Sequence, residues 1–235
     1  FRSRPLHPSP YMNARNKEYN LKLDVRQIPD AIACIFHSLL LHRSTGKFQY
    51  KNDTNFSLGS IGIKEVECEC IDLAYVRVNS DELERRLSED VRDFHAEVER
   101  NTRGMREDEC HTQIGMQFYQ RRRKQWLFSQ EEFVPWEQWT LNLAVLFSPS
   151  EDLGNLREQT AESLSEIVLS VCSSINRPQY IPKMPSKKEV ADIFDTQYSD
   201  VQPFLFKIVR PRDSSSPGGG MAYTVRKLVK DTLFI

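Results

Sequence analysis

The apolar positions near the start of the chain change from the spacing of a strand to that of a helix. Between residues 19 and 25 they alternate with polar residues, as in a strand with one buried face: Tyr19, Leu21, Leu23 and Val25. Pro29 suits the first turn of a helix, and the apolar residues around it recur at helical spacing: Ile28, Ile32, Ile35, Phe36, Leu39 and Leu40. We therefore predict a helix over 28–45 that ends near Gly46, in a left-handed conformation.

Two further long helices are predicted, over 80–100 and 149–176. In the first, Asn79 and Glu82 resemble an N-terminal capping pair, and an apolar stripe lies opposite a charged face. The second begins with Ser148 and Pro149, a cap followed by a proline at the first helical position. The stripes are Leu83, Leu87, Val91, Phe94 and Val98 in the first helix, and Leu153, Leu156, Leu164, Ile167, Val168, Val171 and Ile175 in the second.

Strand-like runs surround these helices without the regular alternation of a parallel α/β fold. We predict strands within 71–78, 114–118, 139–147 and 204–209, and a last strand that follows the SSSPGGG loop and runs to Ile235. No linker within 19–235 separates two cores, and residues 1–11 contain three prolines and no periodic pattern. The order of elements predicts an α+β domain, in which a mainly antiparallel, twisted sheet carries three long helices on one face, after a flexible tail.

The amino-acid composition disfavours several classes of function. With 32 Lys+Arg against 33 Asp+Glu, the net charge of −1 disfavours non-specific nucleic-acid binding, which depends on neutralising phosphates. The five cysteines are scattered and form no C-x-x-C pair, which is typical of reduced thiols in a cytosolic protein. No run approaches the roughly 20 apolar residues that cross a bilayer. We also find no hydrophobic leader.

No motif predicts an enzyme, a metal or a cofactor. The nucleotide-binding, serine-hydrolase and zinc-protease signatures are missing, and Gly218–Gly220 reads as a loop. Cys68 and Cys70 could be half of a metal site, but a second pair of ligands is lacking, and buried thiols are the simpler explanation. Cys110 and His111 are adjacent in sequence, so their side chains are poorly placed to act together as nucleophile and base.

The unusual segment is KQWLFSQEEFVPWEQW, residues 124–139, which contains all three tryptophans. It follows a basic run: Arg121, Arg122, Arg123 and Lys124. Trp139 continues the alternation of a core strand, and Trp136 is expected to pack against the sheet. Trp126, Leu127 and Phe128 lie between two predicted strands, where a connection normally runs over the surface. Large apolar residues there either fold back onto the domain or form an interaction patch.

Residue types alone leave four explanations open for residues 121–139. The first is packing in the core. The second is recognition of another protein, in which Trp and Arg are frequent anchors. The third is contact with an anionic membrane surface, and the fourth is stacking on nucleic-acid bases.

Several blocks of this chain resemble the autophagy-related protein 101 family, small HORMA-domain proteins of the autophagy-initiation machinery. The likeness runs in order from Met12 to Ile235, which implies a single HORMA domain over 12–235. Met12 looks like the natural initiator, and residues 1–11 like upstream or expression-derived sequence. The blocks are MNARNKEYNLKL at 12–23, LLLHRSTGKFQY at 39–50, YVRV at 75–78, QFYQRRRKQWLFS at 117–129, VPWEQW at 134–139, YIPKMP at 180–185, FDTQYSDVQPFLFKI at 194–208 and RKLVKDTL at 226–233.

The resemblance implies a protein without enzymatic activity that works through partners. The family pairs with the HORMA domain of autophagy-related protein 13 and protects it from degradation, within the kinase complex that initiates autophagosomes. The expected location is the cytoplasm and the preautophagosomal structure, with only indirect membrane contact. A projecting Trp/Phe "WF finger", which recruits downstream factors, maps onto Trp126 and Phe128. The intervening residue is proline in relatives but Leu127 here, so the φ restraint is lost.

Two functional surfaces are thus predicted, with one rival. A polar segment after the first predicted helix could dock the partner HORMA domain, although it could equally be a helix cap: His42, Arg43, Ser44, Thr45, Gly46 and Lys47. The finger forms the second surface. The rival hypothesis is a peripheral membrane protein that uses the basic and aromatic residues of 121–128.

Overall fold

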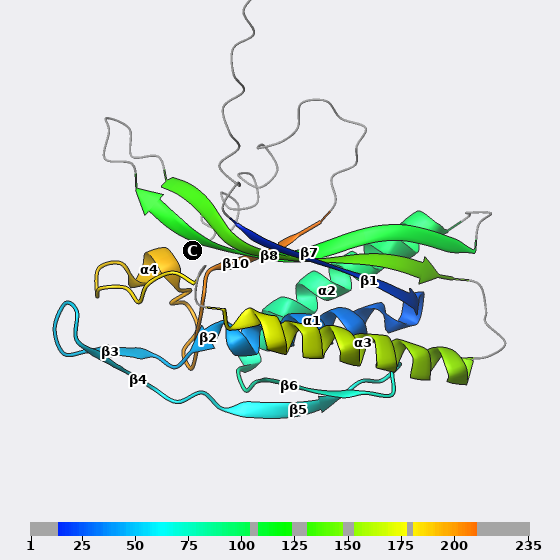
Figure 1. Cartoon of the computed structure of the whole chain (residues 1–235), viewed down its shortest axis with the longest axis horizontal. Coiled ribbons are helices and arrows are strands. Elements are labelled where there is room, and N and C mark those ends of the chain that lie inside the picture. The colour runs from blue at the N-terminus through cyan, green and yellow to red at the C-terminus, as the bar shows by residue number, and fades with distance from the viewer. Residues whose placement is uncertain (1–13, 104–107, 124–130, 148–152, 178–180, 211–235) are drawn as a thin grey trace, which may run out of the picture.

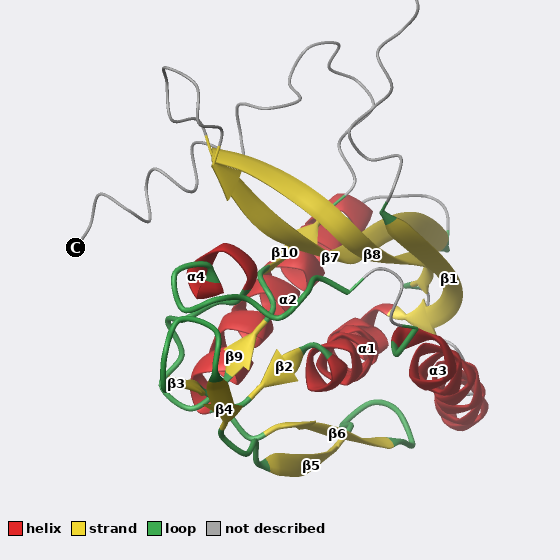
Figure 2. Cartoon of the chain, turned by 60° about the vertical axis from the view of Figure 1, so that its left-hand side comes forward, coloured by secondary structure: helices red, strands yellow, loops and turns green. Residues whose placement is uncertain are grey.

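The computed structural model describes residues 14–103, 108–123, 131–147, 153–177 and 181–210. A twisted sheet lies on one side of the molecule, and the long helices cover one of its faces (Figure 1). A separate two-stranded hairpin lies on the far side of the helices (Figures 1 and 2). The predicted α+β fold, with three long helices on one face of a mainly antiparallel sheet, is confirmed.

The main sheet has the strand order β1-β8-β7-β10. The long strands β7 (Glu109–Arg123) and β8 (Glu131–Leu146) form an antiparallel hairpin. β10 (Phe206–Val209) is antiparallel to β7, whereas β1 (Arg15–Asp24) is parallel to β8. The first predicted strand thus occurs, but it begins four residues earlier than Tyr19, and Val25 already belongs to the short 3-10 helix η1 (Val25–Gln27).

Three long helices occur where the apolar stripes predicted them. They are α1 (Ile28–His42), α2 (Asp81–Thr102) and α3 (Leu153–Ile175), and a short helix α4 (Val190–Ile193) adds to the prediction. All five predicted apolar positions of α2 are buried. The predicted start of α3 at Ser148 and Pro149 lies outside the described residues.

Four smaller pairs of extended segments complete the description. Ser44–Thr45 (β2) pairs with Gln202–Pro203 (β9), and Phe48–Tyr50 (β3) pairs with Phe56–Leu58 (β4). Ile63–Glu67 (β5) pairs with Ala74–Val78 (β6), and single residues Phe194 and Phe204 form a bridge. The tail 1–11, the SSSPGGG loop and the predicted last strand lie outside the described residues.

Two predictions about helix ends were wrong. Ser80 rather than Asn79 caps α2, because the Ser80 hydroxyl accepts a hydrogen bond from the Leu83 amide at 3.4 Å. The first helix ends at His42 rather than 45, with Arg43 as its C-terminal cap. Gly46 is required for a different reason than a left-handed turn: a Cβ there would lie 2.0 Å from the carbonyl oxygen of Gly59.

The core lies between the main sheet and the helices, and it includes two of the tryptophans. Trp139 and Trp136 are buried, as predicted. Phe118 of β7 lies opposite Glu137, but the next residue, Tyr119, lies opposite Pro135. Trp136 is therefore the extra residue of a β-bulge, which locally bends the strand and increases its twist. The indole of Trp136 packs edge-to-face on Phe204, with ring centroids 5.3 Å apart.

Candidate functional site

The β7–β8 hairpin extends beyond the rest of the main sheet. On β8, pairing with β1 covers only Glu137–Leu146, and on β7, pairing with β10 covers only Gly115–Phe118. Beyond the bulge, residues 120–123 pair only with residues 131–134. Figure 1 shows this end of the hairpin rising away from the helices. We call these eight paired residues the projecting ribbon.

Two of the basic positions of the projecting ribbon are in register with acidic positions, whereas Arg121 lies opposite Phe133. Arg122 is in register with Glu132, and Arg123 with Glu131. Opposite charges at directly facing positions of an antiparallel pair attract one another. Arg121, Arg122 and Arg123, three members of the predicted basic patch, are successive residues of β7, so Arg121 and Arg122 point to opposite faces of the ribbon. Lys124, the fourth member, lies outside the described residues.

An aromatic pair supports the base of the ribbon. Tyr119 and the exposed Phe133 contact each other edge-to-face, with centroids 5.4 Å apart. The Lys207 ammonium from β10 lies 6.0 Å from the centre of the Tyr119 ring. Trp126, Leu127 and Phe128, the predicted finger, lie outside the described residues, but the strands on either side of them are held in register up to Arg123 and Glu131.

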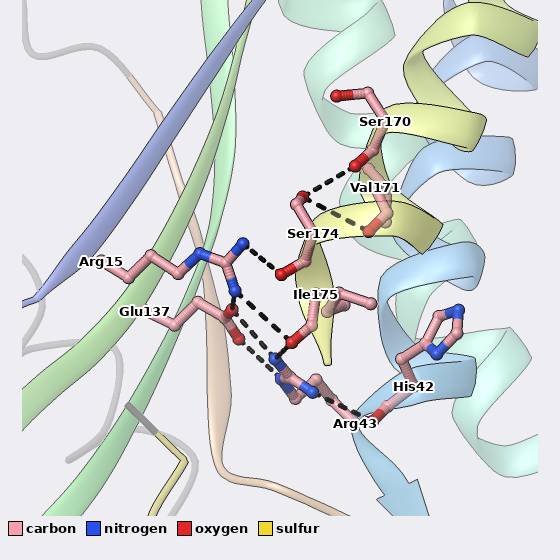
Figure 3. Close-up of polar contacts among 8 residues, drawn as sticks. All are labelled: Arg15, His42, Arg43, Glu137, Ser170, Val171, Ser174 and Ile175. Carbon is pink, nitrogen blue, oxygen red and sulfur yellow. Dashed lines mark hydrogen bonds and ion pairs between the residues drawn. The ribbon is translucent and has the colours of Figure 1, made fainter. Parts of the chain in front are cut away.

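Glu137, at the bulge below the ribbon, is the centre of a buried ionic cluster (Figure 3). It is 0% exposed. Arg43, at the end of α1, donates two hydrogen bonds to its carboxylate, at 2.6 Å and 3.0 Å. The Arg15 guanidinium from β1 lies 3.5 Å from the same carboxylate. A bidentate guanidinium–carboxylate pair is among the strongest charge-assisted contacts in proteins.

The two arginines also satisfy the C-terminal end of α3. Arg43 donates to the Ile175 carbonyl at 2.6 Å, and Arg15 donates to the Ser174 carbonyl. Such carbonyls have no partner inside the helix and carry its partial negative charge. The guanidinium groups also lie over the indole rings, Arg15 at 5.2 Å from Trp139 and Arg43 at 5.6 Å from Trp136. The hairpin is thereby joined to β1, α1 and α3 at one buried point.

The segment 42–47, predicted as a partner surface, divides into buried and accessible parts. Arg43 is only 2% exposed, so its side chain belongs to the core. Its backbone fits the alternative of a helix cap, because the Arg43 N–H donates to the Leu40 carbonyl. Thr45 donates to the Gln202 carbonyl at 3.3 Å, and Lys47 to the Tyr198 carbonyl. His42, Ser44, Thr45 and Lys47 remain partly accessible.

His42 lies beside helix α3. Its Nε2 atom is 3.7 Å from the Cys172 sulfur, an exposed thiol. Burial, and secondarily the charge of Arg43, lowers the pKa of His42, so its imidazole is mainly neutral near pH 7. One helical turn before Cys172, Leu169 is 69% exposed. The end of α1 and the outer face of α3 thus form one surface of mixed polarity.

Sequence reasoning missed Arg15, Glu137 and Leu169 among these residues, and the last two left a signal. Glu137 occupies the same alternating phase as Trp139, Leu141 and Leu143, which marks it as an inward-facing charge. Leu169 is an apolar residue that we did not include in the buried stripe of α3. Only the structure shows what surrounds each of them.

The described residues contain no constellation for metal chemistry. No group of three or more His, Cys, Asp or Glu side chains among them could hold a metal ion. Burial raises the pKa of Cys68 to about 12, so this thiol stays protonated at neutral pH. His111 is paired with Glu109 at 3.5 Å rather than with Cys110. In the same part of the chain, no helix is both long and apolar enough to cross a bilayer.

Comparison with known proteins gives a consistent result. A family model described as Autophagy-related protein 101 matches residues 20–188. The chain is 39% identical to Autophagy-related protein 101 of Homo sapiens over 223 residues, which cover 94% of this chain and 99% of that protein. The identity to the Xenopus tropicalis protein of the same name is 38% over the same length. A protein of that name from Arabidopsis thaliana is 24% identical over 184 residues, 69% of this chain and 76% of that protein.

Proposed function

The chain belongs to the autophagy-related protein 101 family of HORMA-domain proteins, and from this membership we propose that it is a non-enzymatic adaptor in autophagy initiation. It works at the preautophagosomal structure, in the cytoplasm, as a subunit of the autophagy-initiation kinase complex. Two surfaces perform this role, one for the partner HORMA domain and one for downstream factors. The observation that carries the proposal is the projecting ribbon, which is fixed at its base by the buried Glu137 cluster.

The first surface binds and stabilises the HORMA domain of autophagy-related protein 13. We assign it to the end of α1 and the adjoining face of α3. His42, Thr45 and Lys47 offer accessible polar groups, Ser44 is partly accessible although its hydroxyl is buried, and Leu169 and Cys172 offer apolar area beside them. Arg43 supports this surface from below through Glu137, and its side chain makes no direct contact with the partner. Exposed apolar residues within a polar surround are typical of protein interfaces.

The second surface is the finger, Trp126 and Phe128, which recruits downstream autophagy factors. Trp is the residue type most enriched in interface hot spots. An anchor of this kind binds best when its support is rigid, because less conformational entropy is lost on binding. The ribbon supplies such support through its strand pairing, which continues up to Arg123 and Glu131, and through the Tyr119–Phe133 contact.

The alternative function, membrane binding through 121–128, is disfavoured by the same pairing. Attraction to anionic lipid requires unneutralised basic groups, each of which contributes about 1 kcal/mol near the surface. Glu132 lies directly across from Arg122, and it therefore reduces the local positive charge. Flotation with vesicles containing anionic phospholipid tests this point: salt-sensitive binding of the protein without any partner would favour the membrane alternative.

Two variants test the adaptor hypothesis, one at each of the two proposed surfaces. Trp126→Ala with Phe128→Ala is expected to leave thermal stability and heterodimer formation intact but to block autophagosome initiation in cells that lack the natural protein. Leu169→Asp, at an exposed position of α3, is expected to weaken binding to the partner HORMA domain by about tenfold or more. A large fall in melting temperature in the double variant would instead place its aromatic residues in the core.

A further inference from the structure

Strand β5 lies at an open edge of the molecule. Within the described part of the chain, β5 pairs with β6 on one side and with no strand on the other. Figure 2 shows β5 outermost, with β6 between it and the helices. An edge strand of this kind presents unpaired backbone N–H and C=O groups, which can accept a further strand.

The exposed face of this edge combines apolar and acidic side chains. Ile63, Glu65 and Glu67 alternate along β5 and therefore point to the same face, where all three are exposed. Ile63 is 66% exposed, and Val76, directly opposite Glu65, is 38% exposed. Ala74 lies opposite Glu67, so neither carboxylate faces a basic residue across the hairpin. Among the described residues, Glu65 and Glu67 take part in no ion pair.

The β5–β6 hairpin is held firmly from its other face. Tyr75 of β6 stacks on His37 of α1, with ring centroids 5.7 Å apart and planes inclined by 15°. The buried Arg77 reaches Glu84 of α2, with its Nε atom 3.2 Å from the carboxylate. These contacts involve the residues of β6 that face the helices. The outer face of the hairpin and the free edge of β5 do not pack against the core. The edge is therefore already in the geometry that strand addition requires.

We propose that the free edge of β5 binds an extended, basic segment of a partner protein by β-strand addition. Backbone hydrogen bonds to residues 63–67 hold the segment, and its alternate side chains lie beside Ile63, Glu65 and Glu67. Lysine or arginine at the positions next to the two glutamates forms cross-strand ion pairs, and an apolar residue covers Ile63. This surface is separate from both the finger and the 42–47 segment.

Charge selects a basic partner over a second copy of the chain. In a parallel, in-register pair of two β5 edges, Glu65 and Glu67 would each lie opposite the same residue of the second copy. In an antiparallel pair centred on Glu65, that residue would face itself. Like charges at facing positions destabilise strand pairing, so both of these self-pairings are disfavoured, whereas a basic strand is attracted to the edge.

The experiment uses the full chain and a short fluorescent peptide of alternating lysine and valine. We expect the fluorescence anisotropy of this peptide to rise on binding, and amide hydrogen exchange in residues 63–67 to slow. Glu65→Lys with Glu67→Lys should weaken binding by about tenfold or more, because two attractive cross-strand pairs become repulsive. The matched control is Glu89→Lys with Asp93→Lys, which makes the same charge change on exposed positions of α2 and should leave affinity unchanged.

Three results would overturn the proposal. The first is no binding of the lysine–valine peptide. The second is an equal loss of affinity in both charge variants, which would mean that the peptide responds to net charge alone. The third is equal affinity for the same peptide with a central proline, since proline lacks the N–H group that strand pairing requires.

Discussion

Replacing Glu137 by glutamine tests how the hairpin is anchored. The substitution keeps the size of the side chain but removes the buried negative charge between Arg43 and Arg15. Breaking one partner of a buried ion pair typically costs about 3–5 kcal/mol, because the other charge is left uncompensated. Both arginines still donate to the carbonyls at the end of α3. We therefore expect the low end of that range, about 3 kcal/mol of lost unfolding free energy.

Urea unfolding followed by tryptophan fluorescence measures this loss, since Trp136 and Trp139 lie against the two guanidinium groups. With a denaturant dependence of about 3 kcal/mol per molar, the midpoint should fall by about 1 M. The control is Glu162→Gln on the exposed face of α3, where a change within about 0.5 kcal/mol is expected. A loss below about 1 kcal/mol in Glu137→Gln would refute the view that this cluster holds the hairpin to α1 and α3.

Two further predictions concern stability. Gly46→Ala should lower the unfolding free energy by about 2 kcal/mol or more, because its Cβ would meet the backbone of Gly59; Gly154→Ala, with nothing within 4 Å of the added carbon, should show no loss in the same urea titration. The His37 imidazole, whose Nε2 atom lies 2.8 Å from the carboxylate of Glu84, lowers the pKa of Glu84 from 4.5 to about 2. The ionised carboxylate therefore stabilises the fold above about pH 4.5, and this contribution disappears as the pH falls towards 2. Glu84→Gln should be less stable than the natural chain at pH 7, and the difference should shrink by pH 3; a difference independent of pH would contradict the pairing.

The elements that could be predicted from the sequence are those with strong local periodicity. Leu83, Leu87 and Val91 recur at helical spacing, and they form the buried face of α2. Trp139, Leu141 and Leu143 alternate, and they form the inner face of β8. The residues on the buried face recur with the period of the helix or strand, so the apolar residues recur in the sequence with the same period. The hairpin connection around the finger was expected for the same reason, because strand patterns lie on both sides of it.

The errors arose where a residue's role depends on a distant contact. Asn79 and Ser80 are both good capping residues, and the sequence did not indicate that Asp200 would hold the Ser80 hydroxyl in place at 2.8 Å. Gly46 was interpreted as a turn residue, whereas its small size is needed for the approach of Gly59. For Arg43 the sequence left a partner surface and a helix cap both open, and only the structure shows that it caps α1 and that its side chain is buried against Glu137.

The sequence by itself determined which faces of its helices and strands are buried, that the fold is of the α+β class, and, through its likeness to known proteins, its family. Only the tertiary structure decided that β1 runs parallel to β8, and that Arg15, Arg43 and Glu137 meet below the projecting ribbon. It alone left the edge of β5 open among the described strands. The physical reason is that periodicity records the environment of each element, whereas pairing and ion contacts depend on which distant segments pack together.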